Sequence, residues 1–163
     1  MKKSSKNKLF PLIAVGCGTI LFLVAFILFV APFLTQTAFG GTVTMSGYDL
    51  TFGDTAFAGV TTAWVFLLIV MIFALCQTLL SVLGLLGKPI EVLDKKMIRL
   101  CIGGCFVVLG IVVGILLFCT KGFVADTILS GMDLGAGAIV AAILSILGGL
   151  VLGCGVILPD YLK

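Results

Sequence analysis

Few residues in this chain could carry out chemistry. Histidine is absent, and the six cysteines form no Cys-x-x-Cys pair. Cys101 and Cys105 would share one face of a helix, but no histidine or carboxylate lies beside them, so we expect no zinc site and no cofactor. We expect the cysteines to be small apolar packing residues, with palmitoylation near Cys101 as the alternative.

The carboxylates offer little more. Asp49 and Asp54 lie close together and could form a paired-carboxylate or cation site, although two solvated turn residues are the simpler interpretation. An enzyme would have to combine them with Tyr48, Asp126 or Asp133. We therefore expect no enzymatic activity, and the sequence has neither a phosphate-binding loop nor a basic nucleic-acid-binding face.

One polar group lies inside an otherwise apolar segment. Gln77, Thr78 and Ser81 fall on neighbouring turns of a predicted helix. In hydrocarbon such side chains need hydrogen-bond partners, and Ser145 or Thr19 could provide one for Gln77. The group could hold helices together, or it could be the polar lining of a channel.

These residues belong to a membrane protein. Hydrophobic residues make up 61% of the 163 residues, charged residues 10%, and the mean hydropathy is +1.37. A soluble domain has about 25% charged residues and cannot hide this much apolar surface. Each of four uncharged runs is long enough to cross a bilayer once as a helix. We predict an all-α membrane protein, a single four-transmembrane-helix domain (1–163) with spans at about 9–34, 61–86, 99–120 and 134–158.

Small residues mark the expected helix contacts. GxxxG motifs occur in the third and fourth spans, and such faces let helix backbones approach closely. Because these spans are joined by a short connection, we expect their small-residue faces to meet. The same groove could instead accept a second copy or a partner's helix. The predicted packing residues are Gly110, Gly114, Ser145, Gly149 and Gly153.

The charges predict the orientation. Eight Lys and Arg residues lie before the first span or between the second and third, whereas only Lys121 lies in the other loops. By the positive-inside rule both termini are cytoplasmic. The lysine-rich start suits a bacterial cytoplasmic membrane. No ionisable residue falls inside a span, which argues against proton-coupled transport.

The outer loop at 35–60 shows strand character. Its residues alternate between apolar and polar on both sides of Ser46-Gly47, which predicts a β-hairpin at 42–53 with its turn at this pair. The second outer loop could add a third strand or form a short interfacial helix. An aromatic belt could form at the head groups from Phe39, Phe57, Trp64 and Phe123. The possible outer partner surface comprises Tyr48, Asp49, Leu50 and Phe52.

Four spans, inside termini, a longer first outer loop of strand character and a shorter second loop resemble the claudin-type tetraspan architecture. The resemblance is one of topology. The paired loop cysteines and the Trp-Gly-Leu-Trp-type signature of that family are absent here, so no functional residue is transferred from it.

The predicted function is that of a non-enzymatic membrane protein. It would serve as an accessory or scaffold subunit that binds a membrane protein partner or a second copy through its hairpin and its small-residue helix faces. The alternative is a small channel or transporter subunit for a neutral or apolar solute, lined by the polar group of the second span. Its surroundings are the lipid bilayer, and no nucleic acid is expected.

Overall fold

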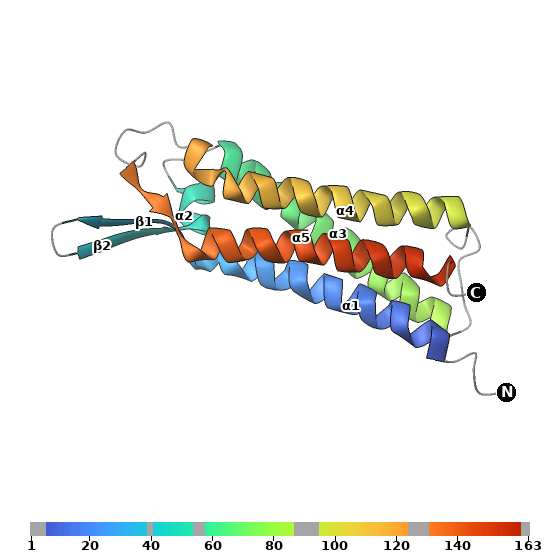
Figure 1. Cartoon of the computed structure of the whole chain (residues 1–163). Helices are drawn as coiled ribbons and strands as arrows, with labels where there is room; N and C mark the ends of the chain where they lie inside the picture. Colours follow the sequence, from blue (N-terminus) through green and yellow to red (C-terminus); the bar gives the residue numbers. More distant parts are fainter. Residues whose placement is uncertain (1–5, 39–40, 54–57, 87–94, 124–130, 161–163) are drawn as a thin grey trace.

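The computed structural model describes residues 6–38, 41–53, 58–86, 95–123 and 131–160. Long helices form a bundle, and a small sheet projects beyond one end of it (Figure 1). The elements are α1 (Lys6–Ile27), η1 (Leu28–Val30), β1 (Pro32–Ala38), β2 (Gly41–Ser46), α2 (Gly47–Phe52), α3 (Ala58–Leu85), α4 (Lys96–Phe118), η2 (Thr120–Phe123), β3 (Asp133–Leu134), α5 (Ala136–Ile157) and η4 (Leu158–Asp160).

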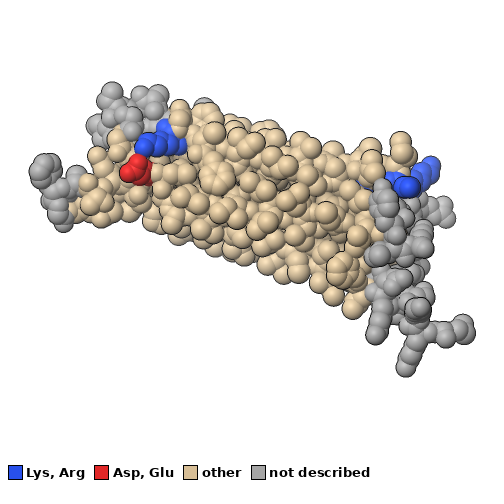
Figure 2. All heavy atoms as spheres, viewed as in Figure 1, with Lys and Arg blue, Asp and Glu red and all other residues tan. Residues whose placement is uncertain are grey.

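The prediction of four spans is confirmed. Four helical stretches of the described chain are long and apolar enough to cross a bilayer: Leu9–Val30, Gly59–Leu85, Lys96–Phe118 and Ala136–Ile157. The flank seen in Figure 2 shows no Lys, Arg, Asp or Glu between the two ends of the bundle. Large apolar side chains cover the outside of the bundle, where lipid tails solvate them. The chain is therefore a multi-pass integral membrane protein.

The helices contribute unequally to the bundle. α5 packs along both α4 and α1, whereas α3 contacts α1 and, over a smaller area, α4. Consequently α5 is the most buried of the four spans and α3 is the least buried. This follows from composition, because α5 carries Gly, Ala and Ser on two faces and α3 is covered with large side chains.

The first span ends earlier than its hydropathy suggests. The α-helix ends at Ile27 and one 3-10 turn follows, and the strand β1 starts at Pro32. Proline lacks the backbone N–H that a continued helix needs, so the apolar run leaves the helical state there. Phe33 and Leu34, which the sequence places in the span, are buried residues of the strand.

The three-stranded sheet has the order β2-β1-β3, with both pairings antiparallel. Thr35 lies opposite Thr44 of β2 on one side and opposite Asp133 of β3 on the other. A small sheet between the first two spans is thus confirmed, but the predicted position of the hairpin is wrong. Its strands are 32–38 and 41–46, and residues 47–52 form the helix α2.

Candidate functional site

The predicted packing residues come together where α4 meets α5. A Cβ atom added to Gly110 would lie 2.8 Å from the Cα atom of Gly149 and 2.7 Å from the carbonyl oxygen of Ser145. A Cβ atom on Gly153 would meet the carbonyl oxygen of Gly103, so the two helices touch backbone to backbone there too, whereas one on Gly114 would first meet the side chain of Ile146. This small-residue face is therefore occupied by α4 and α5 of one chain.

The opposite face of α5 is equally close to α1. A Cβ atom at Gly18 would lie 2.8 Å from the backbone nitrogen of Leu152, and one at Gly155 would lie 2.9 Å from that of Val15. Gly18 and Gly155 are not among the predicted packing residues. Their signal was the run of glycines in α5 at positions that cannot all share one helix face.

Two members of the polar group of α3, Thr78 and Ser81, make hydrogen bonds within the bundle. The Oγ1 atom of Thr78 lies 2.8 Å from that of Thr19 on α1, and it donates to the carbonyl oxygen of Ala74 at 2.9 Å. The Ser81 hydroxyl donates to the carbonyl oxygen of Gln77 at 2.8 Å, and the Gln77 side chain is half-buried. Thr19 is thus a partner of Thr78.

Ser145 was the other partner expected for Gln77. Its hydroxyl donates to the carbonyl oxygen of Ala141 within α5 at 2.8 Å. Both hydroxyls expected to meet Gln77 therefore make hydrogen bonds elsewhere.

The cysteines were expected to fill the interior, and this prediction is wrong. All six have exposed side chains and none is in a disulfide. The helix contacts are so close that glycine, alanine and serine fill them, which leaves the larger thiols on the outside. A thiol is weakly polar, so it remains stable against lipid. Within the described residues no group of three or more His, Cys, Asp or Glu side chains could hold a metal ion.

The hairpin end of the molecule rests on a cluster of aromatic rings. We define the hairpin end as β1, β2, α2, η2 and β3. The rings of Phe29 and Phe33 lie 4.7 Å apart, those of Phe26 and Trp64 lie 5.6 Å apart, and those of Phe52 and Trp64 lie 5.0 Å apart. These contacts hold β1 against η1, α1 against α3 and α2 against α3, because aromatic pairs add to the free energy of apolar burial.

The helix α2 begins with a capping box. The Ser46 hydroxyl accepts a hydrogen bond from the backbone N–H of Asp49 at 3.1 Å. The Asp49 carboxylate in turn accepts from the backbone N–H and the hydroxyl of Ser46, at 3.1 and 2.7 Å. These bonds lower the pKa of Asp49, with the Ser46 hydroxyl contributing most. The pattern Ser-x-x-Asp at residues 46–49 is the signal of this cap in the sequence.

The expected outer partner surface is only partly exposed. Leu50 is fully buried and cannot contact a partner, because residues 47–52 wind as a helix that turns it inward. Tyr48 is half-buried and stacks on Phe52, whose side chain is 64% exposed. Asp49 is exposed but serves the cap of α2.

The structure describes two of the four residues that were predicted to form the aromatic belt. Trp64 belongs to the ring cluster, and its indole nitrogen is buried without an acceptor among the described residues. Phe123 of η2 is exposed and lies against Gly59. Phe39 and Phe57 lie outside the described residues, as do Asp54 and Asp126.

No family model, curated protein or solved structure matches this chain.

The two edges of the sheet differ sharply. The β3 edge is two residues long, and its Asp133 carboxylate accepts a hydrogen bond from the ammonium group of Lys121 at 2.9 Å, which lowers the pKa of Asp133. The β2 edge is six residues long and uncharged, and residues 41–44 are exposed. Because β2 is the last strand of the sheet in the part of the chain that the structure describes, its outer N–H and C=O groups can still pair with a strand.

Proposed function

We propose that this protein is a non-catalytic subunit of a membrane complex and that the hairpin formed by β1 and β2 binds its partner. The observation that supports this most strongly is the β2 edge, which lies beyond the membrane-spanning helices (Figure 1). Proteins usually protect such an edge with a lysine, a proline or a short strand. The six residues of β2 include neither a lysine nor a proline.

The helix contacts give this proposal further support. The small-residue faces of α4 and α5 meet one another, and the opposite face of α5 meets α1, so these faces are already filled by helices of the chain itself. The hydroxyls of Thr78 and Ser81 make their bonds inside the bundle. No observation favours the alternative of a channel lined by these groups.

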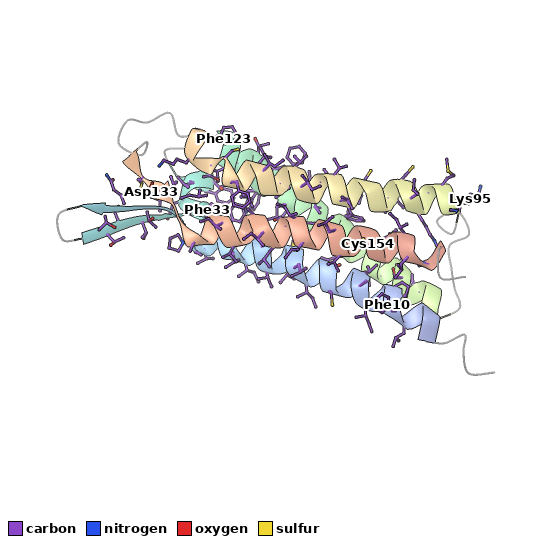
Figure 3. The ribbon with its side chains drawn as sticks, in the orientation of Figure 1. Phe10, Phe33, Lys95, Phe123, Asp133 and Cys154 are labelled. Atoms are coloured by element: carbon purple, nitrogen blue, oxygen red, sulfur yellow. The ribbon has the colours of Figure 1, made fainter. Side chains whose placement is uncertain are left out.

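We also propose an orientation. Lys95, Lys96 and Arg99 lie at the start of α4, at the opposite end from the hairpin. Figure 3 shows Lys95 at one end of the molecule and Asp133 at the other. The positive-inside rule places the Lys95 end in the cytoplasm and the hairpin outside. A bacterial cytoplasmic membrane is the proposed location.

Purification in native nanodiscs, followed by native mass spectrometry, tests the proposed function. We expect the wild-type protein to carry a partner of constant stoichiometry and the Thr44→Lys variant to lose it. Gly122→Lys is the matched control, because it adds the same charge at the hairpin end where a side chain meets nothing within 4 Å. Loss of the partner in both variants, or in neither, would contradict the assignment of the hairpin as the binding element.

A further inference from the structure

The free β2 edge restricts what can bind to it. It presents Gly41, Thr42, Val43 and Thr44 as exposed residues, and Val43 is 61% exposed. The strands β1 and β2 together contain no Asp, Glu, Lys or Arg. A segment that binds by adding a strand to the sheet must therefore be extended. Its side chains would meet no charged group on β1 or β2 with which to form an ion pair.

A second copy in the same membrane does not fit this edge. β2 runs along the bundle axis (Figure 1), so the two-fold axis that relates two copies in one membrane would run along the strand. Rotation about such an axis places each residue of one β2 strand beside the same residue of the other β2 strand, but with its side chain on the opposite face of the sheet. In a regular ladder, two residues that lie side by side on neighbouring strands direct their side chains to the same face. This symmetry therefore cannot form regular strand pairs.

A head-to-tail assembly of copies is also unfavourable. It would pair the β2 edge of one copy with the β3 edge of the next. β3 offers only Asp133 and Leu134, and the carboxylate of Asp133 is held by Lys121. Two residues provide too short a ladder to hold two molecules together, because even a two-stranded hairpin is marginally stable in water.

We infer that the β2 edge binds an extended, uncharged segment of a different protein, which adds a fourth strand to the sheet. This inference rests on the proposed function and specifies the partner's chemistry. Backbone hydrogen bonds supply the affinity in this mode of binding. β-Branched or threonine side chains beside Thr42, Val43 and Thr44 give the favourable cross-strand pairs.

The probe for the test is a synthetic peptide with the β1 sequence Phe33–Ala38. This segment is uncharged, and in the chain it already pairs with β2 along the other edge. We expect hydrogen exchange, followed by NMR on the protein in nanodiscs, to slow about tenfold or more at every second amide of β2. The same peptide with alternate amides N-methylated cannot complete the ladder and should have no effect.

Two neighbouring substitutions separate edge binding from simple unfolding of the hairpin. Successive residues of a strand direct their N–H groups to opposite sides, one toward β1 and one toward the free edge. Of Val43→Pro and Thr44→Pro, one should therefore abolish peptide binding while the β1–β2 register is kept, and the other should disrupt the hairpin. Unchanged binding by a variant that has lost its edge N–H would overturn the inference.

The partner complex purified for the proposed function provides the second measurement. We expect the same alternate β2 amides to be protected in that complex. If the complex forms while these amides exchange as fast as in the free protein, the proposed function stands and the inference fails. Protection in a dimer of this chain alone would also overturn it. If nothing binds the hairpin end, both proposals fail.

Discussion

At the residue scale, glycine sets how closely the helices pack. Lipid tails are as apolar as leucine, so helices in a membrane gain little from hiding apolar groups and depend on close contact instead. Gly110 and Gly149 provide this contact because a Cβ atom on either would meet backbone atoms of the other helix. Backbone cannot move aside as a flexible side chain can.

The Gly110→Ala variant tests this closeness. We expect the free energy of unfolding to fall by about 1–3 kcal/mol, the usual cost of overpacking. Gly104→Ala is the control on the same helix, since its added Cβ would have no neighbour within 4 Å. It should leave stability unchanged or slightly higher because alanine favours helix. Steric-trap unfolding in bicelles measures both, and an equal loss in the two variants would contradict the argument.

The hydrogen bond between Thr19 and Thr78 joins α1 to α3, the least buried span. A double-mutant cycle with Thr19→Val and Thr78→Val, each close in shape to threonine, isolates its contribution to stability. We expect a coupling free energy of about 0.6 kcal/mol, the average for such bonds in membranes. A coupling near zero would show that each hydroxyl is satisfied by the helix carbonyls alone.

The lowered pKa of Asp49 makes the stability of α2 in its position against α3 depend on pH. Because the pKa is lower in the folded state, the stabilisation is present above the unfolded value of about 4 and is lost as pH falls through the folded value. Trp64, the one tryptophan of the sequence, contacts Phe52 of α2 and reports its position. Its fluorescence should change in the wild type below about pH 4.

Asp49→Asn is the control for this change, because it cannot gain a proton there. The change in Trp64 fluorescence should be strongly reduced in that variant. An equal change in both proteins would assign it to another group, such as Asp133, whose pKa is lowered by Lys121.

At the element scale, the sequence predicts the spans but not the details of the sheet. Charge-free runs of about 20 residues identify membrane helices because an unsatisfied backbone is costly in lipid. The structure of residues 48–52 is harder to predict, because alternation of apolar and polar residues over five positions is also compatible with one helical turn that places Tyr48 and Phe52 on the same face. The capping box of Ser46 and Asp49 decides in favour of the helix.

The remaining parts of the sheet depend on contacts between distant residues. β3 pairs with β1 across about 100 residues of sequence, through Leu134 opposite Leu34. No local pattern predicts this pairing, since two residues are too few to show a period. The free β2 edge follows from the same strand order, so the candidate site became visible only once the sheet order β2-β1-β3 was known.

At the scale of the whole molecule, the two ends of the bundle are chemically distinct. In the described chain, the Lys95 end also carries Lys96 and Arg99, and the hairpin end carries Lys121 beside Asp133. Basic residues near a span resist transfer across the membrane, so this difference predicts that Thr44 faces outward and Lys95 inward.

Single cysteines placed at Thr44 and Lys95 test this orientation. All six native cysteines are exposed, so replacing them with alanine should leave the packed interior intact. In intact cells, a membrane-impermeant maleimide should label Thr44→Cys at once and Lys95→Cys only after permeabilisation. The reverse pattern would place the β2 edge in the cytoplasm. Its partner strand would then have to come from a cytoplasmic protein, and the proposed outer complex would be wrong.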